Sequence, residues 1–354
     1  MHSILIKNGK IWDGERFFVG DVLLREGRVE AISKQINALA SFVYDAQGQI
    51  VSAGLIDSHV HIRGLSNATT GVRLAAFAPF GVTSAVEAWA EQLADGALGG
   101  YERNVLAFAG LCVRDNRIDT AHTEKVLPLL KDCAIGVKLC YDTDGCDVRD
   151  ITPVKQAVAY AQEKGLKLMV HCNRSPVSMD EIVQELRQGD VLTHPYHGGK
   201  HSAREDDFAC LRHAKEKGVI LDAGFAGHIH TDFGVYREAV EKGYLPDTIS
   251  TDLTLFSAFK RGGRYGMTAM MSLARECGQS EESIFKAVTS TPANVFGKGD
   301  AWGHLQEGRI ADVAVFSCEN EPFALTDASG NRVAWQQGYR CKMTIQGGEI
   351  IWKD

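Results

Sequence analysis

The sequence predicts an α/β protein: a (β/α)8 barrel of the TIM type, with a small β-sandwich domain built from both termini. Three observations lead to this fold class. The two ends of the chain are rich in short strand-like segments, eight apolar runs alternate with helical stretches between them, and metal-binding residue types recur in those runs. Strand–helix alternation repeated eight times over about 250 residues is the layout of such a barrel. We place the two parts of the sandwich at residues 1–52 and 305–354, and the barrel at residues 53–304.

The terminal segments are predicted to be β-rich. The N-terminal end contains the alternating stretches ILIKNGKIWD, FVGDVLLREGRVEAIS and FVYDAQGQIVSAG, with turn signals at Asn8-Gly9 and Glu26-Gly27. The stretches GRIADVAVFS and RVAWQQGYRCKMTIQGGEIIW near the C-terminus have the same pattern. Because each end is too short to fold alone, we expect the two ends to join in one sheet domain.

The middle of the chain alternates between strands and helices. Several of its apolar runs are almost continuously hydrophobic, as expected for strands buried on both faces. The eight runs are SHVHI, VTSAVEAWA, VLAFAGLCV, AIGVKLCY, KLMVHC, DVLTHPYH, VILDAG and TISTDLT. The helical stretches TPVKQAVAYAQEKG, MDEIVQELRQG and DDFACLRHAKEKG stop at Gly165, Gly189 and Gly218, which is a regular helix stop.

Composition excludes several classes of function. The 354-residue chain has a formal net charge of −7 with scattered lysines and arginines, so we expect no nucleic-acid partner. It has no apolar run long enough for a membrane span, and its N-terminus lacks the layout of a signal peptide. We therefore expect a cytoplasmic protein that acts on a small molecule, with a homo-oligomer as the general prior.

The cysteines point away from a sulfur-based metal site. The nine cysteines are an odd set without a CxxC pair, which favours reduced thiols over a disulfide framework. Any bound metal is then expected to be held by histidines and carboxylates.

The stretch AGLIDSHVHIRG, residues 53–64, contains the first candidate metal ligands. On a strand, His59 and His61 point to the same face, and two imidazoles on one face make half of a metal site. The alternative is an exposed strand that carries two histidines by chance. Further candidates fall near the ends of other predicted strands, where barrels collect their functional groups. They are Lys138 in GVKLC, His171 in LMVHC, His194 in VLTHPYHGG and Asp252 in ISTDLT.

These residues need a common partner, because burying one polar group without a partner costs on the order of several kcal/mol. Four histidines and one aspartate exceed the needs of one tetrahedral zinc but suit two adjacent ions. Lys138 is the exception, since an ammonium group would be repelled by two dications. Carboxylation by carbon dioxide would turn it into an anion that bridges the ions. The alternative is an unmodified lysine paired with a carboxylate at a strand end.

The motifs GLIDSHVH, GVK, VHC, THPYHG and STDLT, in this order, resemble the amidohydrolase superfamily, and most of all its dihydroorotase-like branch with the metal-dependent deacetylases. The segment from Thr289 to Phe316 is similar to the one by which these enzymes return to their β-sandwich.

The resemblance implies a site with two divalent cations, most often zinc. His59 and His61 would bind the more buried metal, and His171 and His194 the more exposed one. N6-carboxylated Lys138 and a hydroxide would bridge the two metals. Asp252 would contact the buried metal and act as general acid and base in the hydrolysis of an amide, cyclic amide or ester.

Substrate contacts are expected from loops next to these strands. Asn173 and Arg174 follow the strand-five histidine, and the arginine either binds an anionic substrate group or lies on the surface. Tyr196 and His197 either line the pocket or pack their loop. His228 and His230 in GFAGHIHTDFG lie near the predicted mouth of the barrel, with solvated loop positions as the alternative.

Two acidic residues are expected outside the ligand set. Asp57, beside the two histidines, is expected to be structural, in a position to orient a histidine. Asp222 at the end of strand seven is predicted to be a structural polar residue.

Two other functions compete with the binuclear hydrolase. The first is a mononuclear deaminase of a nucleobase-like ring, which would not need a bridging lysine at position 138. The second is a catalytically inactive scaffold, which should have lost ligands, whereas all six positions are filled here.

Overall fold

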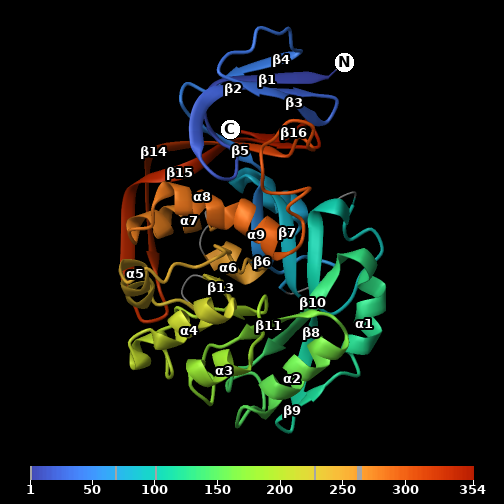
Figure 1. Ribbon diagram of the computed structural model, residues 1–354, viewed down its shortest axis with the longest axis vertical. Helices are drawn as coiled ribbons and strands as arrows, with labels where there is room; N and C mark the ends of the chain where they lie inside the picture. The colour runs from blue at the N-terminus through green and yellow to red at the C-terminus, as the bar shows by residue number, and fades with distance from the viewer. Residues whose placement is uncertain (1, 68–69, 100–101, 227–228, 261–264) are drawn as a thin grey trace.

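The computed structural model describes residues 2–67, 70–99, 102–226, 229–260 and 265–354. A barrel of parallel strands occupies one part of the molecule, and a sheet built from both ends of the chain lies beside it (Figure 1). The predicted α/β class, the barrel and the contribution of both termini to a second sheet are confirmed. In the described residues, no helix combines the length and apolarity that crossing a membrane requires.

The barrel wall contains seven regular strands, each parallel to its neighbour in the order β13-β12-β11-β10-β8-β7-β6. They are β6 (Leu55–Val60), β7 (Val82–Ala90), β8 (Val105–Arg114), β10 (Ala134–Cys140), β11 (Lys167–His171), β12 (Val191–Thr193) and β13 (Ile220–Asp222). A short strand, β9 (Arg117–Asp119), pairs antiparallel with β8. Six of the predicted runs therefore became strands across the middle of the chain with small shifts at their ends, and the first run, SHVHI, became β6, which starts earlier, at Leu55.

The predicted eighth strand closes the barrel without becoming a regular strand. Single parallel bridges join Thr248 to Asp222 on β13 and Leu253 to Val60 on β6. The backbone N–H of Asp252 donates to the carbonyl of His59 at 2.8 Å. This irregular segment brings Asp252 next to the end of β6.

The helices lie outside the barrel strands (Figure 1). They are α1 (Thr123–Leu130), α2 (Thr152–Glu163), α3 (Met179–Glu185), α4 (Ala209–Lys217), α5 (Phe233–Glu241), α6 (Leu255–Lys260), α7 (Met267–Glu276), α8 (Glu281–Val288) and α9 (Ser290–Val295). Gly165 and Gly218 follow α2 and α4 with φ of +66° and +70°, as predicted for helix stops. The helix α3 ends earlier than predicted, because the residue after it, Leu186, is already extended.

The second sheet is mixed and has the order β16-β15-β14-β5-β1-β2-β3, with β4 parallel to β1. Its strands are β1 (Ser3–Trp12), β2 (Phe17–Arg25), β3 (Arg28–Ser33), β4 (Phe42–Asp45), β5 (Ile50–Ala53), β14 (Val313–Thr326), β15 (Arg332–Gln346) and β16 (Glu349–Lys353). The antiparallel pair β5 and β14 joins the two ends of the chain, with Ala53 opposite Val313. The sheet has its own core, which includes Ile4, Val51 and Met343.

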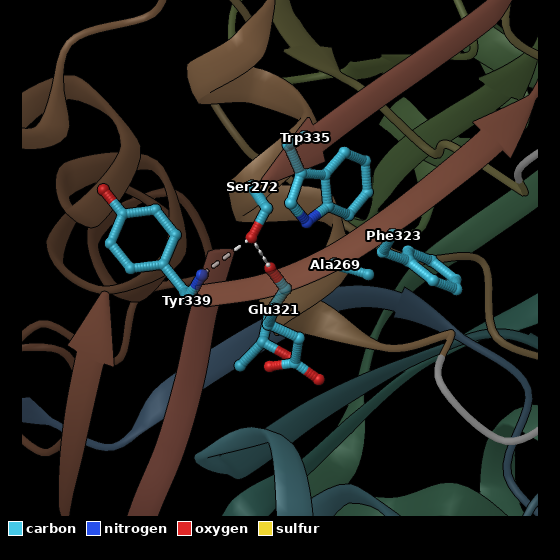
Figure 2. Close-up of a pocket in the computed structure, with 7 residues that line it drawn as sticks. Ala269, Ser272, Glu321, Phe323, Trp335 and Tyr339 are labelled. Carbon is cyan, nitrogen blue, oxygen red and sulfur yellow. Dashed lines mark hydrogen bonds between the residues drawn. The ribbon is translucent and has the colours of Figure 1, made fainter. Parts of the chain in front are cut away.

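The long hairpin β14–β15 leaves this sheet and packs on α7. Figure 2 shows the contact: the N–H of Tyr339 donates to the hydroxyl of Ser272 at 2.9 Å, and that hydroxyl donates to the carbonyl of Thr268 at 2.7 Å. Trp335 and Phe323 meet edge to face beside it, with ring centroids 5.3 Å apart. The cavity left here is about 30 Å³, which is the space of one water molecule, so this contact is packing and not a ligand site.

Trp12 of β1 packs the terminal sheet against the barrel. Its side chain is 1% exposed, its ring lies 4.8 Å from the Phe17 ring between centroids, and its indole N–H donates to the Thr289 hydroxyl at 3.0 Å. We predict that Trp12→Ala lowers the free energy of unfolding by about 3–5 kcal/mol, because it removes a large buried side chain and leaves a cavity. Urea denaturation measures this effect, with the exposed Leu39→Ala as control. A loss below about 1 kcal/mol, the range of ordinary surface substitutions, would contradict it.

Candidate metal centre

The six residues predicted as metal ligands lie at the same end of the barrel. His59 is in β6 and His61 directly follows it, Lys138 is in β10, and His171 ends β11. His194 follows β12, and Asp252 lies in the segment that closes the barrel. Together with His230, most of them line a cavity of about 410 Å³. Parallel strands that end at one rim bring together side chains that are up to 193 residues apart, from His59 to Asp252.

The carboxylate of Asp252 lies between two pairs of imidazoles. Its Oδ1 is 3.2 Å from Nε2 of His61 and 3.5 Å from Nε2 of His59. Its Oδ2 is 3.8 Å from Nε2 of His230 and 4.0 Å from Nε2 of His194. Burial would raise the pKa of Asp252, but these imidazoles hold it well below its ordinary value. The carboxylate therefore stays charged and faces nitrogen atoms on both sides.

His59 is held by groups on its far side. Its Nδ1 lies 3.1 Å from Oδ2 of Asp222 and 2.9 Å from the hydroxyl of Thr193, so the ring donates its proton there. The lone pair of Nε2 then faces Lys138, whose Nζ is 2.7 Å away. Burial, and next the nearby Lys138, lower the pKa of His59 and favour the neutral ring that binds a metal.

Asp222 has a larger role than the structural one predicted for it. Besides His59, its carboxylate accepts hydrogen bonds from four hydroxyls: those of Ser58, Thr193, Thr248 and Ser250. These groups come from β6, β12 and the closing segment. Asp222 therefore fixes His59 and ties three parts of the rim together. The serines and threonines at the strand ends were the feature of the sequence that could have indicated these hydrogen bonds.

Asp57 holds the closing segment and also accepts from the backbone N–H of His59. Its two oxygens accept the backbone N–H of Thr251 at 3.0 Å and the Thr251 hydroxyl at 2.6 Å. Because Thr251 directly precedes Asp252, this contact fixes the position of the central carboxylate.

His61 is held in the same way by β7. Its Nδ1 is 3.1 Å from the hydroxyl of Ser66 and 3.4 Å from Oε1 of Glu87. Glu87 is fully buried and also accepts the N–H of Trp89 at 2.7 Å. Nε2 of His61 is left to face Asp252.

His194 and Asp252 share an unusual backbone. Their φ angles are +64° and +49°, in the left-handed region that costs most residues about 1–3 kcal/mol. The Nδ1 of His194 donates to the carbonyl of Gly224 at 2.6 Å, which directs Nε2 into the cluster. This Nε2 is buried and has no hydrogen-bond partner. A buried nitrogen without a partner, reached through strained backbone, fits a metal ligand.

His171 lies beside a loop carboxylate. Its Nε2 is 3.3 Å from Oδ2 of Asp142 and also lacks a hydrogen-bond partner. Asp142 is bound by Arg174, whose Nη2 lies 2.7 Å from the same oxygen, and Arg174 also pairs with Asp144 at 2.8 Å. Burial would raise the pKa of Asp142, but the neighbouring His171 imidazole and the hydrogen-bonded Arg174 guanidinium keep it low. Arg174 is thus already paired with two carboxylates of the protein, and their negative charges disfavour the binding of an anionic substrate group at this arginine.

His230 is a member of the cluster that sequence reasoning placed only near the mouth. Its ring centroid lies 4.4 Å from that of His194 and 4.8 Å from that of His171. His171, His194 and His230 form one group of three ligand atoms within 4.8 Å, and His59, His194 and Asp252 form another. The signal available in the sequence was a histidine eight residues after Asp222, at the end of strand seven.

Asn173 contacts His230 and was predicted to contact substrate. Its side-chain Nδ2 donates to Nδ1 of His230 at 2.9 Å, so Asn173 orients a histidine of the cluster. With this hydrogen bond the neutral ring carries its proton on Nε2. A half turn of the amide would instead place Oδ1 opposite Nδ1 and free Nε2 to bind a cation.

The remaining residues predicted to contact substrate are Tyr196, His197 and His228. Tyr196 is fully buried and its hydroxyl donates to the carbonyl of Tyr244, so it packs its loop and does not line the cavity. Of the two alternatives for Tyr196, burial and this hydrogen bond favour packing of the loop over a position in the cavity lining. His197 is 2% exposed, and burial lowers its pKa to about 4. His228 lies outside the described residues.

The cluster fits two cations. The imidazole Nε2 atoms of His171 and His194 have no partner, five histidines converge, and Asp252 offers one oxygen to each half. Neutral imidazole and carboxylate are the ligands that zinc and related metals take in catalytic sites. Such cations would polarise a carbonyl group and lower the pKa of a water molecule between them.

The comparisons with known proteins agree with this geometry. The sequence profile described as "Amidohydrolase family" matches residues 152–351. A protein of Enterococcus faecalis named "Deacetylase" is 28% identical over 381 residues, which cover 99% of each chain. The crystal structure of a dihydroorotase is similar with a TM-score of 0.86 and 25% identity, covering 99% of this chain and 98% of that one. The crystal structure of an adenine deaminase gives 0.85 and 25%, covering all of both chains.

We predict that Asp222→Asn weakens metal binding by about 10- to 100-fold, because the amide cannot accept from His59 and from all four hydroxyls at once. Competition with a chromophoric chelator measures the affinity. The control is Asp247→Asn, since Asp247 accepts the N–H of Leu221 on the same strand but lies outside the cluster. Equal affinities for the two variants would refute the role of Asp222.

We predict that His230→Gln removes one cation from a protein that binds two, because the group with His171 and His194 loses a ligand. Metal analysis after dialysis and the absorption spectrum of the cobalt-substituted protein report the change. His213→Gln on α4, where His213 pairs with Asp180, is the control. If metal content stays the same while turnover falls, His230 is a proton donor to the reaction and not a ligand.

Proposed function

The chain belongs to the amidohydrolase family, and from this premise we propose that it hydrolyses an amide, cyclic amide or ester bond of a small molecule with two divalent cations, preferably zinc. The observation that carries the proposal is the position of Asp252, with one carboxylate oxygen toward His59 and His61 and the other toward His194 and His230. A site for one cation would need only one of these halves.

We assign His59, His61 and Asp252 to the first cation, and His171 and His194, with His230, to the second. Support for this division comes from the rigid supports behind each half. Asp222 and Glu87 lie beside Nδ1 of His59 and His61, and the carbonyl of Gly224 accepts from Nδ1 of His194 in the second half.

Lys138 is proposed to bridge the two halves as an N6-carboxylated lysine. Its side chain is 4% exposed, and its Nζ lies next to Nε2 of His59, the nitrogen proposed to bind the first cation. An ammonium group in this position would face two dications. Burial is the largest influence on Lys138 and lowers its pKa, which favours the neutral amine, the form that reacts with carbon dioxide.

Cations held by these histidines and Asp252 would lower the pKa of a bound water molecule and polarise the substrate carbonyl. Asp252 does the proton transfer. Its charged carboxylate accepts the proton of the attacking water through Oδ2, the oxygen that faces the cavity side with His194 and His230. It then gives this proton to the leaving nitrogen or oxygen.

The walls of the cavity support a substrate with an uncharged group next to the scissile bond. Besides the histidines, Lys138 and Asp252, the lining includes Trp89, Cys112, Val113, Cys140, Gly145 and Cys146. In the described part of the cavity lining, the one lysine or arginine is Lys138. An N-acyl group or an uncharged ring fits this lining better than a carboxylate does.

The second candidate function is a nucleobase-type deaminase with one cation. The observation that favours it is the structural similarity to an adenine deaminase over the whole chain. The two functions differ in the need for Lys138 and in the product, since a deaminase releases ammonia from an amino-substituted ring.

We expect purified protein to hold about two metal equivalents and to hydrolyse some of a panel of N-acyl amino acids, cyclic ureides and lactones. Lys138→Ala should lose metal and activity together, with partial rescue by a short carboxylate that takes the bridging position. Lys167→Ala is the control. Lys167 starts β11, at the end of that strand away from His171, and its Nζ donates to the carbonyl of Gly189.

A fully active Lys138→Ala protein would overturn the binuclear proposal. About one metal equivalent, together with ammonia released from adenine-like rings and no hydrolysis in the panel, would establish the deaminase instead.

A further inference from the structure

Two thiols meet in the wall of the candidate active-site cavity. Cys140 is the last residue of β10, and Cys146 lies in the loop that follows. Both side chains line the cavity, and their thiols interact with each other. Both residues are partly exposed, whereas Cys133, Cys172, Cys210, Cys277 and Cys341 are buried. The pair is therefore open to small reagents that reach the cavity.

The loop between the two cysteines is folded tightly around Asp142. The carbonyl of Asp142 accepts the N–H groups of Cys146 at 2.9 Å and Gly145 at 3.3 Å. Its Oδ1 accepts the N–H of Asp144 at 2.8 Å. These hydrogen bonds turn the chain back toward the end of β10 and bring Cys146 near Cys140.

The arrangement does not suit a separate metal site. In the described residues, the groups of three ligand atoms within 4.8 Å are the two histidine groups of the metal centre, and neither includes a cysteine. Cys112 also lines the cavity but does not complete such a group. Two thiols in contact, without a third ligand, are suited to disulfide chemistry.

We propose that Cys140 and Cys146 are an oxidisable dithiol that closes to a disulfide in the cavity wall. With a hydroperoxide as oxidant, the sulfur of one cysteine attacks a peroxide oxygen, the O–O bond breaks and a sulfenic acid forms. The sulfur of the other cysteine then attacks, the S–S bond forms and the hydroxyl group leaves as water. Two thiols and one hydrogen peroxide thus give one disulfide and two waters.

The disulfide would alter the site because of what lies inside its ring. The ring encloses Asp142, which contacts His171 at 3.3 Å and is bound by Arg174. At the other end, Lys138 is two residues before Cys140 on β10 and so points to the same face of the strand. Formation of the disulfide ring would displace the segment from Lys138 to Asp142. This effect on catalysis rests on the proposed function, whereas the disulfide itself does not.

The experiment treats the full-length, metal-loaded protein with hydrogen peroxide and counts thiols after denaturation. We expect the loss of two of the nine thiols, a mass lower by two hydrogen atoms, and one cross-linked peptide that contains Cys140 and Cys146. Dithiothreitol should restore both thiols. Cys140→Ser and Cys146→Ser should each abolish the cross-linked peptide. Cys112→Ser, the matched control from the same cavity lining, should still form it.

Thiol counting needs no substrate, so its result does not depend on the proposed function. A cross-link between Cys112 and Cys146, a link between two chains, or oxidation of Cys140 and Cys146 to sulfinic acids without a cross-link would overturn the proposal. With a substrate from the panel in hand, oxidised protein should turn over more than about tenfold more slowly, the effect of displacing a group behind a metal ligand, and should recover on reduction. Full turnover by quantitatively oxidised protein would overturn the inference that the pair controls the site.

Discussion

The structure depends on one constraint: a cluster of polar side chains is buried at the rim of the barrel, and each member must have a partner. Asp252 is the central charge, with imidazole nitrogens 3.2–4.0 Å from its two oxygens. The unpartnered nitrogens of His171 and His194 show that the protein groups alone do not satisfy the cluster. Divalent cations would satisfy it and would offset the strained backbone of His194 and Asp252.

A second layer of carboxylates explains how the cluster keeps its geometry. Asp222 fixes His59, Glu87 lies behind His61, and Asp57 anchors Thr251 next to Asp252. Each of these acidic residues is buried and comes from a barrel strand, so the ligands are positioned by the rigid part of the fold. The irregular eighth segment is the exception. This segment has no regular strand pairing, and its backbone turns at Asp252, which places the carboxylate between the histidines of the cluster.

Two parts of the cavity lining differ in chemistry. The histidines and Asp252 supply the polar part of the lining, and Trp89, Val113 and three cysteines supply much of the rest. The polar part suits the reaction and the rest suits an uncharged part of a substrate. The same lining contains the Cys140–Cys146 pair, and its loop also holds Asp142 beside His171. Redox sensitivity would therefore depend on the loop after β10, whereas the metal site depends on the strands.

Seven of the eight barrel strands, the sheet from both termini and the six residues at the rim could be predicted from the sequence, because strand period and strand ends are local patterns that place side chains. The sequence did not determine the roles of Asp222, His230 and Asn173, or the burial of Tyr196. Those depend on which groups face one another across strands and loops distant in the chain. Hydrogen bonds between such groups have no local signature, and so only the tertiary structure decided them.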